Sequence, residues 1–439
     1  MLKILRQPGS LFRGRSAFFQ NTLKLFIGSG IAQAISVLLS PILTRLFDPN
    51  DFGLYTFYIY IVAGLVLIAS LRYELAIVYS DNDRDAVNVL SLSTIISLAL
   101  SFLVLILVIL YRLFLYHLLP VSPILLSWFF WMPALIICLS VTNILQNWLV
   151  RKKEFRTLSA GKVVNSIGNN GFMLLLGVLG WGAWGLFTGY FAGTVIFLLF
   201  LLFMVFRSNR GLLRMTDRQT LRLMTVKYKD LPLSNSPQAL FEMLQNYGII
   251  YLAKIFFSST IVGFYALSMR ILQAPLWLIG SAFFQVYMQD ASDRYNRNES
   301  LVPLVNKTMK MAFLAVTPVL ITLFIFGPWL FGVVFGHNWR EAGVYARILA
   351  PWMFFDFVRF TVSQTPMIVG KARTMFHISL IGNALMIAAM CIGGWMHQVI
   401  TGFVILSCLM SLYAISVILW IRYIAAHVKK GPAPDNKQP

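Results

Sequence analysis

The chain has 439 residues, of which 58% are hydrophobic and only 12% are charged, and its net charge is +20. A soluble domain typically has about 25% charged residues, so this chain lacks the polar side chains needed to cover a water-facing surface. The mean hydropathy of +0.75 indicates a polytopic membrane protein and excludes an ordinary soluble enzyme.

A helix needs about 20 consecutive apolar residues to cross the hydrocarbon core of a bilayer. By that measure the sequence predicts an all-α fold with about twelve membrane-spanning helices. In chain order these are residues 23–43, 54–76, 87–110, 124–149, 163–180, 184–206, 232–253, 260–288, 311–335, 343–368, 375–394 and 399–421.

The positions of lysine and arginine predict the orientation of these helices. If both termini are cytoplasmic, most of the 36 Lys and Arg residues fall on the cytoplasmic side, as the positive-inside rule requires. The exceptions are Arg45, Arg112, Lys254 and Arg340 on the opposite side, and Arg72, Arg270, Arg347 and Arg359 within or at the edges of spans. We therefore expect both ends of the chain in the cytoplasm.

The richest basic segment, residues 207–231, predicts the domain organisation. Its arginines recur at helical intervals with leucines between them, which is typical of an amphipathic helix touching anionic lipid headgroups and does not favour nucleic acid. As a linker it divides the chain into an N-terminal lobe (1–206), a C-terminal lobe (232–422) and a cytoplasmic tail (423–439).

The two lobes are predicted to be repeats, because polar stripes recur at the same place in each. Ser29, Gln33 and Ser36 share one face of the first span, and Gln238, Glu242 and Gln245 have the same spacing in the seventh. A little further on, Gly53-Leu54-Tyr55 is echoed by Gly263-Phe264-Tyr265. Both halves begin inside and contain an even number of spans, so we expect parallel repeats whose polar stripes line a cavity.

Charged residues within the spans are the candidate site residues. An ionisable group at membrane depth costs about 3 kcal/mol or more and usually faces protein or water. Asp356 and Arg359 are three residues apart on one helical face, so they form either a structural ion pair or part of a cavity wall. Arg270 lies too deep to reach the interface, and we expect it to be a cavity cation.

Arg72 and Glu74 are two residues apart in the second span, and on a continuous helix they would point to different faces. Snorkelling or a local salt bridge is as plausible for this pair as a role in binding. Glu242, Glu74 and Asp356 are candidates for proton or cation coupling. The sequence has no nucleotide-binding loop and no metal-ligand spacing, so we expect neither a cofactor nor a metal.

Four stretches, "SPILTRLFDPNDFGLYTF", "LRYELAIV", "RKKEFRTLSAGKVVNSIGN" and "GWGAWGL", resemble the polysaccharide transporters of the multidrug/oligosaccharidyl-lipid/polysaccharide (MOP) superfamily, especially Wzx-type flippases. The resemblance implies two six-helix lobes that alternate access across the bacterial inner membrane. The implied cargo is an undecaprenyl-diphosphate-linked oligosaccharide for O-antigen, capsule or exopolysaccharide. The implied partners are membrane lipids, a repeat-unit polymerase and a chain-length regulator.

Two other functions stay open at this point. A MATE-type antiporter for cationic drugs would share the fold but would favour acidic residues in its cavity. A membrane glycosyltransferase or polymerase would find support in Asp81-Asn82-Asp83, which could hold the metal of a nucleotide sugar. Because acidic residues also suit a helix N-terminus, this Asp-x-Asp is more typical of a polar turn before the third span.

Overall fold

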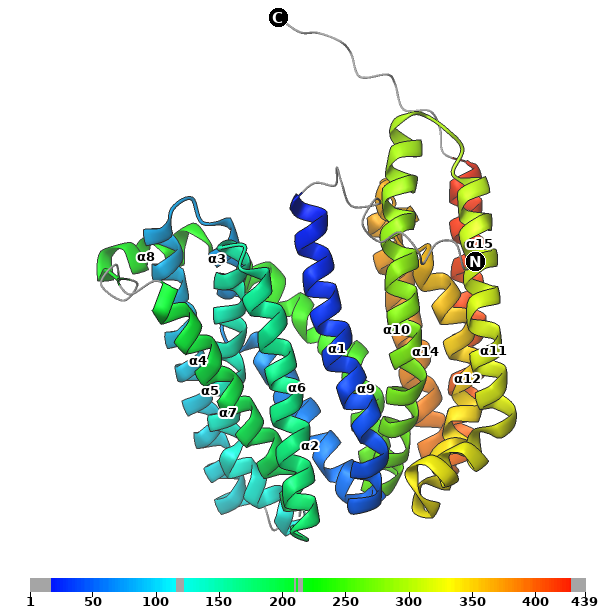
Figure 1. Ribbon diagram of the computed structural model, residues 1–439, viewed down its shortest axis with the longest axis horizontal. Helices are drawn as coiled ribbons and strands as arrows, with labels where there is room; N and C mark the ends of the chain where they lie inside the picture. The colour runs from blue at the N-terminus through cyan, green and yellow to red at the C-terminus, as the bar shows by residue number, and fades with distance from the viewer. Residues whose placement is uncertain (1–16, 116–121, 209–210, 212–215, 428–439) are drawn as a thin grey trace, which may run out of the picture. The chain divides into compact units, whose positions relative to one another are not determined.

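The computed structural model describes residues 17–115, 122–208, 211 and 216–427, and all of the regular elements in these ranges are helical (Figure 1). The chain forms two compact units. Unit 1 comprises Met1–Leu39 and Tyr58–Leu244, and unit 2 comprises Ser40–Phe57 and Gln245–Pro439. The helices α1, α2 and α9 therefore each contribute residues to both units.

Twelve helices in the described ranges have 20 or more residues, in agreement with the predicted number of spans. They are α1 (Ala17–Leu46), α2 (Pro49–Ile68), α4 (Asp83–Leu110), α5 (Pro123–Arg151), α6 (Phe155–Val178), α7 (Ala183–Ser208), α9 (Ser236–Phe256), α10 (Ser259–Asn296), α11 (Val302–Phe335), α12 (Arg340–Thr361), α14 (Ala372–Trp395) and α15 (Val399–Ala426). The short helices are η2 (Tyr73–Leu75), α3 (Ala76–Tyr79), η3 (Tyr111–Leu115), α8 (Arg218–Lys227), η5 (Leu231–Asn235), η6 (His337–Trp339) and α13 (Thr365–Ile368). The prediction of an all-α polytopic fold is confirmed.

Several helix boundaries follow from capping residues. Asn82 begins α4 by accepting a hydrogen bond from the Asp85 backbone N–H at 2.8 Å, and Asp217 begins α8 by accepting one from Thr220. Side-chain oxygens at these positions satisfy N–H groups that have no partner within the helix. After α11 the chain turns at Gly336, whose φ of 105° is a conformation that glycine adopts without strain.

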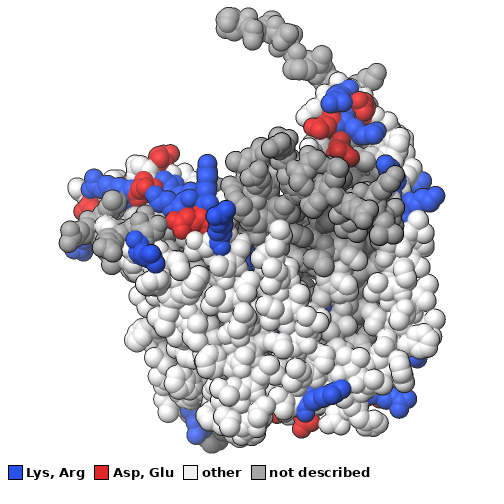
Figure 2. Space-filling model, viewed as in Figure 1, with Lys and Arg blue, Asp and Glu red and all other residues white. Residues whose placement is uncertain are grey.

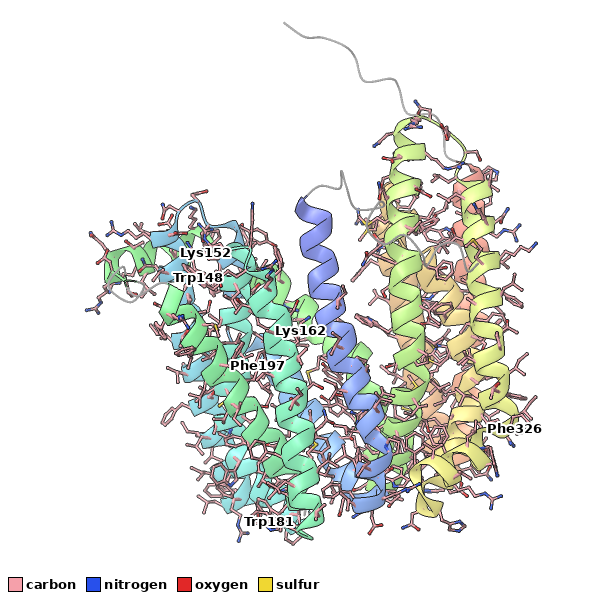
Figure 3. All side chains as sticks on the ribbon, viewed as in Figure 1. Trp148, Lys152, Lys162, Trp181, Phe197 and Phe326 are labelled. Atoms are coloured by element: carbon pink, nitrogen blue, oxygen red, sulfur yellow. The ribbon has the colours of Figure 1, made fainter. Side chains whose placement is uncertain are left out.

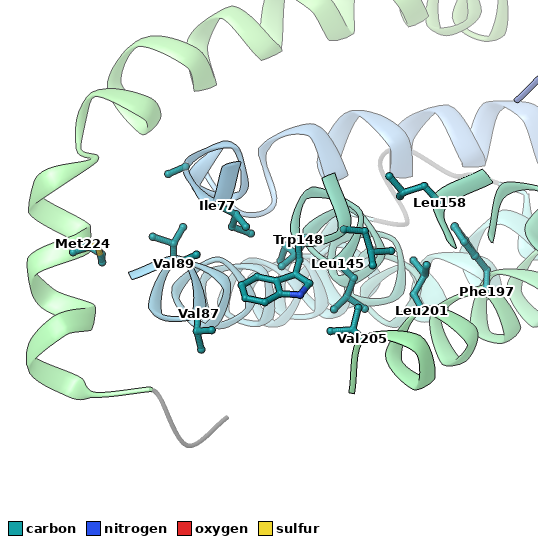
Figure 4. Packing of buried hydrophobic residues seen from close by; sticks show 14 residues of the cluster. Ile77, Val87, Val89, Leu145, Trp148, Leu158, Phe197, Leu201, Val205 and Met224 are labelled. Atoms are coloured by element: carbon teal, nitrogen blue, oxygen red, sulfur yellow. The ribbon is translucent and has the colours of Figure 1, made fainter. Parts of the chain in front are cut away.

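The core of unit 1 is a cluster of apolar side chains around Trp148, contributed by α3 to α8 (Figure 4). Met224 brings α8 into this cluster. Of the predicted amphipathic segment at 207–231, residues 209–210 and 212–215 lie outside the described residues, and α8 forms the helix at Arg218–Lys227. Its other apolar side chains, Leu223 and Val226, are exposed. The predicted contact of this segment with lipid headgroups stays a prediction.

In unit 2, the turn between α1 and α2 packs against η6 and the start of α10. The indole Nε1 of Trp339 donates a hydrogen bond to the Thr44 carbonyl at 2.7 Å, and its ring meets Phe52 edge-on at 5.3 Å. Gly53 and Gly263 allow the first turns of α2 and α10 to approach closely. Helix α12 packs against α10, α11 and α15, and α14 packs against α15.

The charged residues on the face in Figure 2 lie at the ends of the helices and leave an uncharged band over their middle parts. On unit 1, Lys, Arg, Asp and Glu gather around α8 and α3. A band without charge is what a bilayer-embedded surface needs, because each exposed charge in the hydrocarbon would be costly.

Candidate functional site

Three of the twelve long helices are polar. Nine of the described helices are long and apolar enough to cross a membrane, and α6, α9 and α12 are not among them. Most of the charged and amide-bearing candidates predicted from the sequence lie on α9 and α12. Because polar groups in a membrane protein must face protein or water, these helices are where a hydrophilic cargo can be bound.

Asp356 and Arg359 form an ion pair on α12, as predicted. Arg359 Nε donates to Asp356 Oδ1 at 2.8 Å, and Nη2 lies 2.7 Å from the same oxygen. The two side chains remain 32% and 21% exposed, and the Nη1 group of Arg359 donates to no described residue. A bidentate bond to an incoming anion is therefore open to this guanidinium without separation of the pair.

The predicted bounds of the helix that carries this pair are wrong, because α12 does not continue to residue 368. It ends at Thr361, and a new short helix starts at Thr365 with Pro366 in its first turn. Proline has no backbone N–H, so a continuous helix would lose a hydrogen bond there. Arg359 consequently lies in the last turn of α12, where a cation is favoured by the helix dipole.

Arg270 lies on α10, eleven residues after Ser259, which places it about 17 Å along the helix axis. The helix extends to Asn296, beyond the predicted end at 288. Arg270 is half-buried and interacts with neighbouring groups.

The glutamine stripes are only partly described. Gln33 and Gln238 are exposed on α1 and α9, and Gln238 also has an interaction partner. The side chains of Glu242 and Gln245 lie outside the described part of the structure, so their places in a cavity stay predictions. Of the candidate coupling acids, the structure thus describes the side chains of Glu74 and Asp356.

Arg72 and Glu74 form a local salt bridge, at 3.9 Å between Arg72 Nη1 and Glu74 Oε1. The expectation that they point to different faces is wrong, because α2 ends at Ile68 and the chain turns there. Leu71 and Arg72 have φ values of 50° and 64°, which places them in the left-handed region and interrupts the helix. Glu74 is buried and also accepts a hydrogen bond from Ser70.

A further cation, Lys162, is not among the predicted site residues. The predicted spans leave it in a cytoplasmic loop before a helix at 163–180, but α6 already begins at Phe155. Seven residues of helix place Lys162 about 10 Å inside that start. In Figure 3 it lies part-way along α6, between Lys152 towards one end of unit 1 and Trp181 at the other.

Lys162 begins a polar seam between α6 and α1 in unit 1. Its Nζ donates to Ser29 at 2.8 Å, and one and two turns later Ser166 and Asn170 face Ser36 at 3.1 Å each. The sequence signal is the four-residue spacing within "GKVVNSIGNN". No acidic side chain in the described ranges pairs with Lys162, and two of its three ammonium donors have no described acceptor.

The Asp81-Asn82-Asp83 motif is engaged in structural contacts. Asp83 pairs with Lys152 at 2.5 Å, Asp81 pairs with Lys227 at 2.7 Å, and Asn82 caps α4. The hydrogen bond and charge of Lys227 lower the pKa of Asp81. Within the described residues, no cluster of three metal-ligating side chains occurs.

Solved structures similar to most of the chain show its fold. It matches an inward-facing multidrug resistance MATE family transporter of the MOP superfamily (TM-score 0.63, 16% identity, 93% of this chain and 96% of that chain). It matches an outward-facing one (TM-score 0.57, 16% identity, 94% and 96%) and a MOP superfamily transporter from Pyrococcus furiosus Vc1 (TM-score 0.54, 17% identity, 94% and 96%). At these identities the likeness shows the fold alone, which is that of the MOP transporters.

The sequence comparison adds the family. The family described as "Polysaccharide biosynthesis protein" matches residues 42–344, which is well over half of the chain. The chain therefore belongs to this family, and the family predicted from the sequence motifs is confirmed. No curated protein matches the sequence.

Proposed function

We propose that this protein is a flippase for undecaprenyl-diphosphate-linked oligosaccharides, which it moves from the cytoplasmic to the periplasmic leaflet of the bacterial inner membrane by alternating access. The finished glycan would be O-antigen, capsule or exopolysaccharide. A repeat-unit polymerase and a chain-length regulator of the same pathway would be its partners. Membership of the polysaccharide biosynthesis family and the MOP transporter fold support the proposal.

The observation that carries the proposal is that each unit has a partly exposed cationic side chain on a polar helix. Each of these side chains has N–H donors without a described acceptor. In unit 1 this is Lys162, and in unit 2 it is Arg359. A lipid diphosphate carries negative charge that must cross a low-dielectric layer. Arginine stays protonated there and binds phosphate oxygens through two parallel hydrogen bonds, while lysine acts as a point charge.

The oligosaccharide needs hydrogen-bonding groups rather than charge. Asn165 and Asn169 on α6, together with Gln33 on α1, supply amide groups in unit 1. The Oδ1 atom of Asn169 is buried against Gly193 on α7, so that oxygen lies within the contact between two helices. Asn165 and Gln33 are therefore the better candidates for bonds to sugar hydroxyls.

The rival function, cation-coupled drug export, predicts acidic residues without cationic partners. The two described candidate acids, Glu74 and Asp356, are each paired with an arginine. For the Pyrococcus furiosus transporter, a reverse polarity of the binding pocket is said to suggest a different function. We infer that the present chain also departs from drug export, with cations serving an anionic cargo.

The test is transport by the purified protein in proteoliposomes, with a fluorescent polyprenyl-diphosphate oligosaccharide whose outer-leaflet fraction is quenched by dithionite. We expect Arg270→Ala combined with Arg359→Ala to abolish flipping without lowering the amount of protein in the membrane. The matched control is Arg340→Ala, an exposed arginine at the opposite end of α12, which should leave flipping unchanged.

Full transport by the double variant would refute the assignment of these arginines. Binding of a cationic dye in preference to the diphosphate lipid would favour drug export. Coupling is tested in the same liposomes: if Glu74 carries a proton, Glu74→Gln should remove the dependence of flipping on a pH gradient.

A further inference from the structure

A groove of about 730 Å³ lies along one face of α7 in unit 1. The described residues that line it recur every three or four positions and therefore share that face. They are Leu199, Leu202, Phe203, Phe206 and Arg207. Leu199, Phe203 and Phe206 are 57%, 59% and 39% exposed. The groove is thus accessible from outside the unit, and its apolar lining ends at a cation.

Arg207 belongs to the groove itself. It is exposed and is the last residue of the apolar span Ala183–Arg207. Its Cζ atom lies 6.0 Å from the centre of the Phe203 ring, one turn earlier in the helix. The ion pairs between described residues all involve other basic side chains. A ligand that fits this groove therefore has an anionic group for Arg207 and hydrocarbon for the rest of the lining.

Helix α8, the next helix in the chain, is held to unit 1 through one face. Met224 is buried in the core cluster of the unit. Tyr73 donates a hydrogen bond to the Thr225 carbonyl at 3.1 Å, and Lys227 Nζ lies 2.7 Å from an Asp81 carboxylate oxygen. These contacts determine which face of α8 points away from the unit.

That outer face of α8 combines cations with apolar side chains. Arg218 and Arg222 are exposed one turn apart, and neither takes part in an ion pair between described residues. Leu223 and Val226, on the same side, are 63% and 67% exposed. Cations interleaved with exposed apolar side chains are typical of a helix that lies in a lipid headgroup layer.

Both features lie at the edge of the uncharged band. In Figure 2 the charged residues of unit 1 gather around α8 and α3 and border the surface without charge. The end of α7 lies close to α8 (Figure 1), and Val205 of α7 belongs to the same core cluster as Met224. The arginines of this region are therefore placed where the hydrocarbon core of a bilayer meets its phosphate groups.

We propose that the groove of α7 and the outer face of α8 form a binding site for anionic phospholipids. Arg207, Arg218 and Arg222 hold the phosphate groups, and the groove holds an acyl chain. Charge complementarity selects an anionic lipid, because the positive choline group of a zwitterionic lipid is repelled by the same three arginines. The inference does not depend on the proposed function.

The experiment is native mass spectrometry of the purified full-length protein in detergent. Phosphatidylglycerol and phosphatidylcholine with the same acyl chains are added in equal amounts. Each arginine close to an anionic headgroup contributes about fivefold in affinity. We therefore expect the wild-type protein to bind phosphatidylglycerol at least about tenfold more tightly. Arg207→Gln, Arg218→Gln and Arg222→Gln together should remove most of this preference.

Three further variants serve as controls. Glutamine at Arg297, Arg340 and Arg373, which are exposed arginines outside this surface, lowers the net charge equally and should leave the preference unchanged. Lysine in place of the three arginines of the site should retain it, because lysine keeps the charge. Leu199→Trp fills the groove and should weaken the binding of both lipids by the same factor.

Equal binding of the two lipids by the wild-type protein would overturn the proposal. An equal loss of preference in the two glutamine variants would also overturn it, since net charge alone would then explain the result. Unchanged binding by Leu199→Trp would refute the place given to the acyl chain. Displacement of the lipid by an excess of a short RNA duplex would assign the arginines to nucleic acid and would overturn the lipid site.

Discussion

Replacement of Gly53 by alanine should destabilise unit 2, because the first turns of α2 and α10 leave no room for a methyl group. A Cβ atom on Gly53 would lie 1.6 Å from the Ser259 carbonyl oxygen, less than half of the 3.4 Å at which ordinary contacts begin. The obstructing atom belongs to the backbone, so no side chain can rotate away. The two helices must move apart.

Overpacking that shifts backbone costs about 1–3 kcal/mol, and for a unit of this size each kcal/mol lowers Tm by roughly 2–4 °C. The assay is thermal unfolding of the detergent-purified protein, followed by tryptophan fluorescence. Trp339 reports on the affected region, since its ring contacts Phe52, the residue before Gly53.

Gly171→Ala is the matched control, because no atom lies within 4 Å of a Cβ built there. It should keep or raise Tm, since alanine favours a helix over glycine by about 1 kcal/mol. Gly263→Ala meets the Pro49 carbonyl oxygen at 2.0 Å in the same contact, so the double variant should cost less than the sum of the two. Equal Tm values for Gly53→Ala and Gly171→Ala would refute the reasoning.

Three further predictions test other contacts. Trp339→Phe keeps an aromatic ring but removes the indole N–H and leaves the Thr44 carbonyl without its 2.7 Å donor, so Tm should fall by the equivalent of about 1–3 kcal/mol; an unchanged Tm would contradict this. Lys227 lowers the pKa of Asp81, and Asp81 raises that of Lys227. The ion pair therefore stabilises the folded state fully above the ordinary carboxyl pKa of 3.8, and this stabilisation is lost as the pH falls through the lowered pKa of Asp81. At pH 7, Asp81→Asn should therefore reduce hydrogen-exchange protection of α8, and the difference from wild type should shrink as the pH falls through the lowered pKa of Asp81; a difference that does not change with pH would assign it to something other than this charge pair. In the flipping assay, Lys162→Arg should retain most activity and Lys162→Gln should lose at least about tenfold, whereas equal activities would exclude an anion contact.

The helices themselves were predictable, because length and hydropathy determine which segments can cross a bilayer. Their ends were less so. The predicted span continues to residue 76, yet the chain turns at Leu71 and Arg72, both with positive φ. Arg72 and Glu74 make this segment less apolar than the rest of the predicted span, but a charge alone does not indicate a turn. The tertiary contact from Tyr73 to the Thr225 carbonyl, at 3.1 Å, accompanies it.

The repeat pattern was informative where it reflected backbone geometry. Gly53 and Gly263 align as equivalent positions in the two halves, and they prove to lie against each other in unit 2. Each lacks a Cβ because the backbone of the other helix occupies that space. The polar stripe of α1 was predicted less accurately: Ser29 and Ser36 contact α6, so part of a stripe assigned to a cavity serves helix packing.

Apolar character is the weakest guide to the helices that carry the candidate site residues. Helices α6, α9 and α12 fall short of the apolar character of a spanning helix, and they carry Lys162, the glutamine stripe and the Asp356–Arg359 pair. A charge at membrane depth costs about 3 kcal/mol or more, so it makes insertion of the helix that carries it into the bilayer less favourable. Pairing recovers only some of that cost, because α12 keeps its guanidinium partly exposed. A cargo that supplies the missing phosphate oxygens would recover more of it during transport, and the same arginine would then favour the loaded protein over the empty one.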